Sequence, residues 1–578
     1  MPCEDEVSMS NVPQGGREYE ATIGSLGLTA SAFDAFGLKP LLGHWLGKCG
    51  SHVAVDTPEL IEALCMQVLT VPHQSMSGTG EFYTDRPLGV LLGRLGVTCQ
   101  DLGRAVLSRM LDEVYAASPD RLFTICAARV AERIGVKPVT LHIDSTSFHY
   151  DGMSRIEDGV PVVLDQGYSR DSHPELNQII SVMMTEEMAK IPLFQKCFSG
   201  NVSDKTSFLS TLSDDLPFIK QQFKELRYVI GDSAFCTSKI ANEAAKQGIW
   251  FVTRIPDTNK EASDCIAQAM EHPEMLSHVD PDDPASPMAM WSGNGKIGEQ
   301  DVVKLTVRNE KLEARKRETV GKHARKELEA LEKKLRKLRT RPCKCQADAE
   351  KCVAELRQSL RLCAITNVSY EEVRRHKHSG RPAPGDKGDL VAVAVKAEAA
   401  VSDELVEEAV NRETYYVVCT NDTGREWTMK DLLATYKRQS VIERNWRCLK
   451  DHRILTSSFY LEKPSRICAL MWLLSLALLV YAATEYLMRK AMRERGLSIH
   501  WTDGRTEMEQ PSLMRMYTYM TNCGIRVHIN AVTGAISITG LRKEIYAVLE
   551  AMGPDWTRYY QWQAYVPQLE ALRVPIGF

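Results

Sequence analysis

The chain has 578 residues, which is too long for a single compact core and predicts two to four domains. Hydrophobic residues make up 44% of it and charged residues 25%, proportions that argue against a largely disordered protein. The formal net charge of −4 excludes a nucleic-acid binder that relies on overall positive charge, so any DNA contact must come from local basic surfaces.

The first 135 residues divide into a tail and a helical region. Residues 1–20 contain early acids, two prolines and two glycines, and they lack the apolar segment of a signal peptide. Residues 21–135 predict a helical N-terminal domain. Its clearest apolar stripe, at helical spacing, consists of Leu102, Val106, Met110 and Val114. The sixteen cysteines have no regular spacing, which indicates reduced thiols in a cytoplasmic protein.

Residues 136–256 change to the pattern of β-strands. Strand signals occur in VTLHIDSTSF, PVVLDQGYSRD, QIISVMMT, LRYVIGDSAF and IWFVTRIP. The apolar run of the first of these ends at Asp144, and the fourth ends at Asp232 before a helical sequence. Strands joined through helices predict an α/β fold with a mixed sheet and flanking helices.

Residues 257–410 interrupt this pattern. The stretch Glu310–Arg341 holds 13 Lys or Arg against 6 Glu, a local excess of 13 − 6 = 7 positive charges. Short coiled-coil spacing follows at Leu328, Leu331, Leu335 and Leu338. A second apolar stripe after Pro342 makes an antiparallel helical hairpin the simplest prediction. Its basic face either follows DNA phosphates or is an ordinary solvated surface, and the sequence leaves both open.

Strand and helix signals resume in residues 411–494. TYYVVCTND predicts a strand, and Thr428 with Asp431 forms a capping-box pattern at the start of one strong helix. On a continuous helix, a polar face would carry Tyr436, Glu443, Arg447 and Lys450. The opposite side, which would pack on the sheet, would carry Leu432, Ile442, Trp446 and Leu449.

The remaining sequence contains an apolar segment and an aromatic cluster. Ile467–Ala483 is shorter than the roughly 20 apolar residues of a membrane span, so a buried core helix is predicted and a membrane anchor is not. Residues 495–578 contain a predicted hairpin, IRVHINAVTGAISI. We expect packing or dimerisation, rather than base stacking, from the aromatic residues Trp556, Tyr559, Tyr560, Trp562 and Tyr565.

Three acids suit a single chemical task. Asp144 and Asp232 end strands, and Glu443 lies on the later helix. Carboxylate oxygens are hard ligands that select Mg²⁺ or Mn²⁺. Two such ions can hold the attacking and leaving oxygens of a phosphodiester displacement, with water or a DNA 3′-hydroxyl as the nucleophile. Small hydroxyl residues after Asp144 would leave room for a phosphate. Any one of these acids alone is more often a cap or turn former.

These residues resemble those of DDE-type insertion-sequence transposases, which have an RNase H-like catalytic domain. The signature helix of that family reads Y-x-x-R-x-x-x-E-x-x-x-x-x-x-K, and the chain matches it at Tyr436, Glu443 and Lys450. The arginine position is Gln439, so Arg438 or Arg447 would have to take over its phosphate contact. The family's first and second acids match Asp144 in IDSTS and Asp232 in VIGDSAF. GYSRDSHPELNQ and FSGNVSDKTSF are similar to a subgroup with a long N-terminal domain, and the likeness covers residues 20 to 490.

The separations agree with this resemblance. Asp144 and Asp232 are 232 − 144 = 88 residues apart, whereas Asp232 and Glu443 are 443 − 232 = 211 apart. The second separation exceeds what one strand–helix unit needs, and the family carries an insertion there. The implied domains are an RNase H-like core in two parts, 136–256 and 411–494, an insertion domain at 257–410, and a C-terminal domain at 495–578.

The resemblance implies cut-and-paste transposition by a hairpin intermediate, catalysed with two Mg²⁺ or Mn²⁺ ions. The partners would be transposon terminal inverted repeats and target DNA, bound by a synaptic homodimer in a bacterial cytoplasm, near the nucleoid and without a membrane. The N-terminal domain would bind the DNA ends, although it has no clear helix-turn-helix. In hairpin-forming relatives an insertion-domain tryptophan holds a flipped base, for which Trp291 is the candidate here, and Arg254 could reach a phosphate.

Three alternatives stay open at this point. A retired transposase would bind DNA without cutting it, and a stand-alone nuclease would cut without joining ends. A zinc site could also be drawn from a group of potential ligands, but the C-x-C-x6-C spacing matches no common structural-zinc pattern. These potential ligands are Cys343, Cys345, Cys352, His376 and His378.

Overall fold

The structure is a computed structural model, and it divides into two compact units. Unit 1 comprises Met1–Thr253, Lys296–Gln300 and Ala434–Phe578, and unit 2 comprises Arg254–Gly295 and Asp301–Leu433. The described residues are 18–47, 54–70, 76–150, 153, 156–169, 173–375, 389–451, 461–501 and 505–573. Most of the predicted N-terminal tail lies outside them.

Helices make up most of the first part of unit 1, which confirms that the N-terminal region is helical. They are α1 (Leu26–Phe36), α2 (Leu38–Trp45), α3 (Thr57–Thr70), α4 (Thr79–Phe82), α5 (Leu88–Leu91), α6 (Arg104–Ala116) and α7 (Pro119–Ile134). Of the predicted stripe, Met110 and Val114 are buried in α6, whereas Val106 is half-buried. Leu102 is buried in a separate 3-10 turn, because Gly103 precedes α6 in an extended conformation.

The C-terminal segment of unit 1 packs on this helical region. Strand β1 (Glu18–Thr22) pairs antiparallel with β15 (Arg526–Asn530), and β15 pairs with β16 (Ile536–Thr539), as the predicted hairpin requires. The remaining elements are β13 (Ile499–His500), β14 (Glu507–Met508), α18 (Leu513–Asn522), α19 (Lys543–Met552), α20 (Pro554–Thr557) and α21 (Val566–Arg573). The two ends of the sequence therefore share one three-stranded sheet.

The aromatic cluster near the C-terminus is mostly part of this packing. Trp556, Tyr559, Tyr560 and Tyr565 are buried, whereas Trp562 is 44% exposed. The Tyr560 hydroxyl donates a hydrogen bond to the Gly24 carbonyl oxygen at 3.0 Å. A Cβ atom at Gly27 would lie 2.8 Å from the Tyr560 ring, so only glycine fits there. The packing role is confirmed for the four buried residues, and dimerisation stays a prediction.

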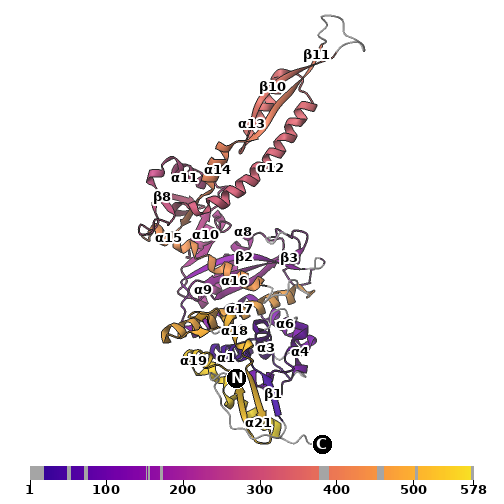
Figure 1. Cartoon of the computed structure of the whole chain (residues 1–578), viewed down its shortest axis with the longest axis vertical. Coiled ribbons are helices and arrows are strands. Elements are labelled where there is room, and N and C mark those ends of the chain that lie inside the picture. Colours follow the sequence, from indigo (N-terminus) through magenta and orange to yellow (C-terminus); the bar gives the residue numbers. More distant parts are fainter. Residues whose placement is uncertain are drawn as a thin grey trace. The chain divides into compact units, whose positions relative to one another are not determined.

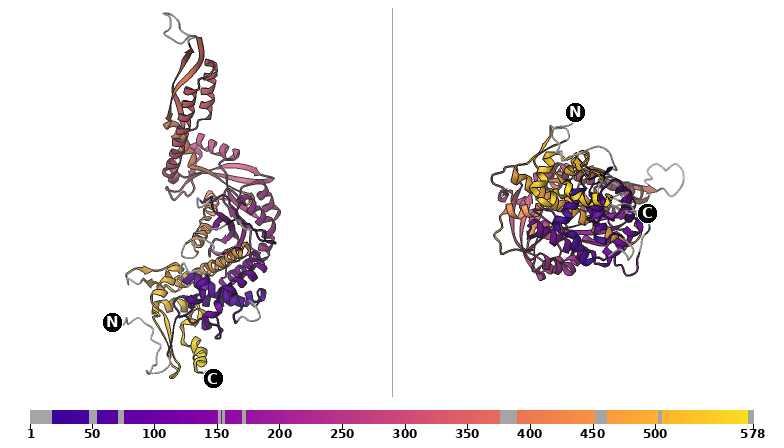
Figure 2. Two further views of the ribbon diagram at one scale, coloured as in Figure 1. Left: turned by 90° about the vertical axis from the view of Figure 1, so that its right-hand side faces the viewer. Right: turned by 90° about the horizontal axis from the view of Figure 1, so that it is seen from below.

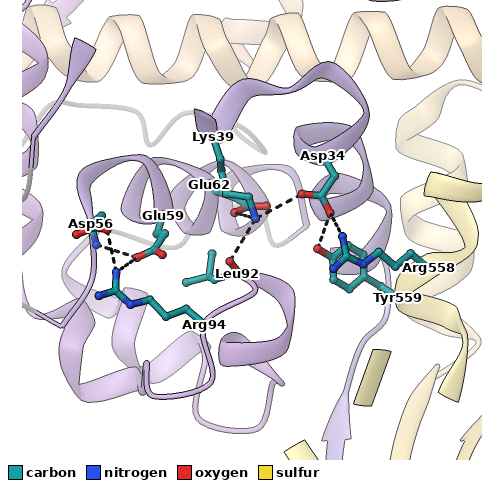
Figure 3. A network of polar contacts seen from close by, with 9 residues as sticks. All are labelled: Asp34, Lys39, Asp56, Glu59, Glu62, Leu92, Arg94, Arg558 and Tyr559. Carbon is teal, nitrogen blue, oxygen red and sulfur yellow. Dashed lines mark hydrogen bonds and ion pairs between the residues drawn. The ribbon is translucent and has the colours of Figure 1, made fainter. Parts of the chain in front are cut away.

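Charged side chains tie α1, α2 and α3 to the same segment (Figure 3). Glu62 is fully buried, and the Lys39 ammonium lies 3.0 Å from its carboxylate. Burial raises the pKa of Glu62 to about 8, against the opposing effect of Lys39. Lys39 also pairs with Asp34 at 3.5 Å, and Asp34 accepts a hydrogen bond of 2.7 Å from Tyr559. This chain of contacts links the N-terminal helices to the C-terminal residues.

A mixed sheet forms the centre of unit 1. Its strands are β2 (Thr140–Tyr150), β3 (Asn177–Glu186), β4 (Pro192–Ser199), β5 (Tyr228–Gly231) and β6 (Trp250–Ile255), which runs across the unit boundary. The order is β4-β3-β2-β5-β6, with β2, β3 and β4 antiparallel and β2, β5 and β6 parallel. Helices α8 (Asp204–Ser210), α9 (Leu216–Gln222) and α10 (Ser238–Lys246) connect them. The predicted α/β, RNase H-like mixed sheet is confirmed.

One predicted strand is absent from this sheet. The segment PVVLDQGYSRD was expected to be a strand, but its described part makes only an isolated bridge between Asp165 and Gln178. Both edges of β3 are already occupied, because β2 pairs along its whole length and β4 pairs from Ile179 onwards. Only the first residues of β3 are left for another partner.

The apolar segment Ile467–Ala483 lies within α17 (Pro464–Arg495). Among the described helices it alone is long and apolar enough to cross a membrane, and 94% of its most apolar window is buried inside the protein. It packs against β4 and against α3, α6, α7 and α19 (Figure 1). The prediction of a buried core helix is confirmed.

Unit 2 contains a second set of strands and helices. Its strands β12 (Tyr415–Thr420), β9 (Gln300–Arg308), β8 (Met288–Ile297) and β7 (Ser277–His278) are neighbours in that order. The helices are α11 (Lys260–Glu271), α12 (Glu313–Thr340), α13 (Gln346–Ser359) and α14 (Asp403–Glu413). Two long antiparallel strands, β10 (Cys363–Arg375) and β11 (Asp389–Val401), form a separate sheet.

The expected antiparallel helical hairpin is wrong in one respect. Helices α12 and α13 exist, but both pack on the β10–β11 hairpin, and α12 runs along it in Figure 1 and Figure 2. Leu331 and Leu335 of the predicted coiled-coil seam are buried against Cys363 and Ile365 of β10. Apolar stripes record which side of a helix is covered, and not what covers it. We call α12, α13, β10 and β11 the helix-backed hairpin.

Candidate active site

Asp144 and Asp232 lie on neighbouring parallel strands of unit 1. Strands β2 and β5 pair with a constant offset, from Thr140 opposite Tyr228 to His142 opposite Ile230. That offset is 228 − 140 = 88, which is also the separation of the two aspartates. Asp144 and Asp232 therefore occupy equivalent positions two residues beyond the last pair. Adjacent strands are about 4.8 Å apart, so the two acids are brought together.

Local hydrogen bonds fix the backbone around each aspartate. The Ser145 amide donates to Asp144 Oδ1 at 2.8 Å, and the Ala234 amide donates to Asp232 Oδ1 at 3.0 Å. Asp232 follows β5 at a turn, where the Thr253 hydroxyl of β6 donates to its carbonyl oxygen at 2.6 Å. Both aspartates are half-buried, so their carboxylates are held by structure and still reach solvent.

The small hydroxyl residues after Asp144 do not line an open space, contrary to our expectation. Ser145 and Ser147 are fully buried, and the Ser145 hydroxyl donates to Asp204 Oδ1 of α8 at 2.6 Å. Side chains alternate along a strand, so these serines point to the opposite face from Asp144. They connect β2 to α8 and leave the other face to the acids.

Helix α16 (Ser440–Lys450) covers the face of β2 that carries Asp144. The Trp446 ring lies 6.2 Å from the Phe148 ring, and Phe148 shares a face with Asp144 because four residues separate them. Asn445 donates to Thr185 Oγ1 at 3.1 Å, and Thr185 lies opposite His142 of the same face. The expected apolar side of the helix is confirmed as buried: Leu432, Ile442, Trp446 and Leu449.

The predicted continuous helix is broken into two. Helix α15 (Met429–Lys437) has the expected capping box, in which the Thr428 hydroxyl accepts the Asp431 amide at 3.0 Å. It ends before Arg438 and Gln439, and α16 begins at Ser440. Gln439 turns inward and its side-chain amide donates to the Ile143 carbonyl oxygen at 3.4 Å. Tyr436 is thus on the segment before Glu443, although Gln439 keeps α-helical backbone angles and the Arg438 amide still donates to the Ala434 carbonyl oxygen at 3.1 Å.

Glu443 lies at the edge of the surface that faces β2. Gln439 precedes it by four residues and Trp446 follows by three, and both contact β2. Glu443 itself is exposed. Among the described residues, no three His, Cys, Asp or Glu side chains are close enough together to share a metal ion. The structure brings Asp144 and Asp232 together and leaves Glu443 on the neighbouring helix.

The turn between α15 and α16 is attached to the sheet through Glu187, next to the end of β3. Arg438 pairs with one oxygen of Glu187 at 3.0 Å, and Nε2 of the buried His142 lies 3.6 Å from the other. The neighbouring His142 ring holds the pKa of Glu187 below its usual value, and Arg438 adds to this. His142 is two residues before Asp144, so this contact connects the helix break to the strand of the first acid.

Comparison with known proteins identifies the family of the chain. Residues 136–480, more than half of the chain, match the family model of the transposase DDE domain. The chain belongs to the DDE transposase family. Residues 19–128 of the transposase match a domain of unknown function, DUF4277. No curated protein matches the chain. A solved piggyBac transposase synaptic complex with hairpin DNA is similar at 9% identity over 95% of this chain and 85% of that chain, with a TM-score of 0.39.

The other predicted contact residues of the transposase are separated between the units. In unit 1, Arg447 is exposed and the Lys450 ammonium lies 5.6 Å from the Phe148 ring. In unit 2, Arg254 pairs with Asp257 and lies 5.4 Å from the Tyr416 ring, so its guanidinium already has partners. Trp291 is half-buried in β8. Their DNA contacts stay predictions.

The alternative zinc ligands form no metal cluster within the described part of the transposase. Cys343 and Cys352 interact with each other, and Cys345 is exposed. His376 and His378 lie outside the described residues. The donor set of Asp144, Asp232 and Glu443 consists of carboxylates alone, which suits the divalent ions that DDE transposases use.

Sequence reasoning missed Glu187 and Asp204, which contact the strand of Asp144 from outside the signature motifs. Asp204 lies in FSGNVSDKTSF, a phrase that had been singled out without a role for its acid. Glu187 gave no local signal, because it sits in a turn after β3 and meets Arg438 from 251 residues away. Such a contact becomes visible only when the strand order is known.

Proposed function

We propose that this transposase cuts and joins DNA strands, with Asp144, Asp232 and Glu443 as the ligands of two divalent metal ions. The observation that supports the proposal is the register of β2 and β5, which pair up to His142 and Ile230, two residues before Asp144 and Asp232, while α16 packs on β2 through Trp446. Two like charges held close together repel, so such a pair is costly unless cations neutralise it.

Glu443 completes the site by a small local movement in this proposal. Its carboxylate is exposed, whereas the flanking residues Gln439 and Trp446 already contact β2. When bound, Mg²⁺ or Mn²⁺ ions neutralise the charge on the attacking and leaving oxygens of a phosphodiester. The protein's own contribution is to fix the three carboxylates, and DNA binding would bring α16 closer to the sheet.

The reaction is an in-line displacement at phosphorus. A water oxygen forms a bond to the phosphorus at the transposon end, the bond to the 3′-oxygen breaks, and that oxygen takes up a proton. The freed 3′-hydroxyl then attacks a phosphorus of the opposite strand, whose bond to the 3′-oxygen of the flanking DNA breaks, so that a hairpin forms and the flanking 3′-oxygen takes up a proton. Water reopens the hairpin by the same displacement, and the 3′-hydroxyl released attacks a target phosphorus, which gives up its bond to the target 3′-oxygen. Arg438, Arg447 and Lys450, near Glu443 in sequence, would contact phosphates, and Arg254 and Trp291 would hold the flipped end.

The N-terminal helical region would bind the terminal inverted repeats, and two copies of the chain would pair the ends. Residues 19–128 form a unit of their own in the family comparison, outside the matched DDE domain. This placement supports a role in binding rather than in strand chemistry.

The test is cleavage of a DNA duplex that carries the element's own ends, with Mg²⁺, by the wild type and by Glu443→Gln. Glu494→Gln, a change at an exposed acid of α17, is the matched control. We expect hairpin and joined products from the wild type and the control, and none from Glu443→Gln. End binding without products in the wild type would favour a retired DNA-binding protein. Cleavage without any joining would favour a stand-alone nuclease.

A further inference from the structure

The positive charges of α12 differ in their partners along the helix. In its first half three of the six Lys or Arg residues are ion-paired: Lys316 with Glu413 and Lys322 with Glu318, both at 2.6 Å, and Arg317 with Glu407. The last part contains six exposed cations and no acid, and within the described residues none of the six takes part in an ion pair. We call these six the distal basic face: Lys333, Lys334, Arg336, Lys337, Arg339 and Arg341.

The packing of α12 fixes which side these cations occupy. Leu331 and Leu335 are buried against β10, and Leu338 packs against the cluster around Val393 and Val395 of β11. The apolar stripe of α12 is therefore buried inside the helix-backed hairpin, and α12 cannot rotate about its axis without exposing that stripe to solvent. The distal basic face is held in solvent by this packing.

An open groove adjoins the distal basic face. It has a volume of about 880 Å³ and lies between α12 and β11. Arg336, Arg339 and Lys396 line it together with Glu332 and Glu398. Lys396 pairs with Glu371, and Asn367 donates to Glu398, so the charges of the strand side are already engaged. The two arginines of α12 are left to face a ligand.

We propose that the distal basic face binds the phosphate backbone of double-stranded DNA without reading its sequence. The inference rests on the proposed function, which makes DNA the substrate. Residues 333–341 span about 12 Å at the rise of an α-helix, and duplex DNA carries one charge in about every 1.7 Å of its axis. The face contains no aromatic residue for base stacking, so a duplex fits it better than a single strand.

This surface would supply a local attraction for DNA that the net charge of the chain does not supply. The chain as a whole has a net charge of −4, so long-range attraction is weak and a concentrated basic patch has to supply the counterion release that drives binding. Phosphate contacts of this kind position DNA and carry no sequence information. We expect the face to hold flanking or target DNA, whose sequence varies from one insertion to the next.

The experiment measures binding of the full chain to a duplex that lacks the element's ends, in EDTA, as a function of salt. The variant Lys333→Gln with Lys334→Gln and Lys337→Gln removes three charges. The same three positions changed to arginine keep them. We expect the glutamine variant to lower the salt slope by about 0.9 per lysine and the arginine variant to leave it unchanged. Thermal unfolding shows whether both variants keep the fold.

A second control separates this surface from charge in general. Changing Lys311, Lys316 and Lys322 to glutamine removes the same charge from the first part of the region, where two of the lysines are ion-paired. We expect a much smaller change of slope. An unchanged salt slope in the triple glutamine variant at Lys333, Lys334 and Lys337 overturns the proposal. The same titration is repeated with double-stranded RNA, and a loss of binding confined to the RNA overturns it as well. The binding assay contains EDTA and therefore does not depend on strand cleavage. If the wild type fails in the separate cleavage assay with Mg²⁺, the proposed function is refuted, but the binding result can still be interpreted.

Discussion

The two halves of the candidate site are held in place by different forces. Asp144 and Asp232 sit on paired strands, where backbone hydrogen bonds set their relative position. Glu443 sits on α16, whose position depends on side chains such as Trp446 and Gln439. The strand half is therefore preformed, and the helix half is placed by contacts that single substitutions can remove.

This difference explains why the structure shows two acids together and the third apart. A strand register is all-or-none, because a shift of one residue would turn every side chain to the other face. A helix on a sheet has no such register, and the helix that carries Glu443 is interrupted at Arg438 and Gln439. We expect metal and DNA to act mainly on the helix half.

The largest effect should come from the strand half. Asp144→Asn should lower cleavage by about a thousandfold and weaken Mn²⁺ binding in the absence of DNA, because it removes one of two preformed ligands. Glu443→Gln should lower cleavage as much but leave most of the Mn²⁺ affinity. Cleavage assays and electron paramagnetic resonance titrations with Mn²⁺ measure the two quantities. Equal losses of Mn²⁺ affinity in both variants would contradict the distinction between the halves.

The next effect should come from the attachment of α16. Trp446 is 5% exposed and packs edge-on against Phe148. Trp446→Ala should lower the free energy of unfolding by about 3 kcal/mol, as expected for a buried tryptophan, and should lower cleavage in the folded fraction. Urea unfolding gives the first value. Trp562→Ala, at an exposed tryptophan of the C-terminal segment, is the control and should change neither. A stable Trp446 variant with full activity would show that α16 is held by other contacts.

The positions of Asp144 and Asp232 were easier to predict from the sequence than the position of Glu443, because strand register depends on local pattern and helix placement depends on distant side chains. The apolar run before each aspartate marks a strand, and the separation of 88 residues equals the observed strand offset. Neither feature depends on distant side chains. The break of the signature helix was missed because Tyr436, Glu443 and Lys450 fit a continuous helical spacing, and nothing local announces that Gln439 turns toward Ile143.

The helix-backed hairpin gives the same lesson at larger scale. The leucine stripe of α12 was correctly taken as a buried seam, but it shares its clusters with the β10–β11 hairpin as well as with the predicted second helix. A stripe fixes the side that is covered, whereas the identity of the cover depends on residues far along the chain. The strands of that hairpin have charged residues on their exposed sides, such as Glu371 and Lys396, which obscured their β-pattern.

A smaller effect is expected at the contact between Glu187 and Arg438. Arg438 is about half exposed, so solvent screens the pair and we expect a coupling of at most about 1 kcal/mol. A double-mutant cycle with Glu187→Gln and Arg438→Gln measures it from unfolding free energies. Because the contact orients the start of α16, we expect the cleavage rate to fall by at most about fivefold, which corresponds to a coupling energy of about 1 kcal/mol. No coupling in either measurement would show that the turn is positioned by Gln439 alone.

The smallest effect is the pH dependence of that same contact. The neighbouring His142 ring, together with Arg438, lowers the pKa of Glu187 in the folded protein below that of the unfolded chain. The folded state therefore binds this proton less readily, and the stabilisation is fully present above the unfolded pKa of about 4.3. It should be lost as the pH falls through the lower, folded value. The difference in unfolding free energy between the wild type and Glu187→Gln should accordingly shrink in acid. A difference that grows as the pH falls would mean that Glu187 is stabilised in its protonated form, and that the helix half is attached to the sheet without an ion pair.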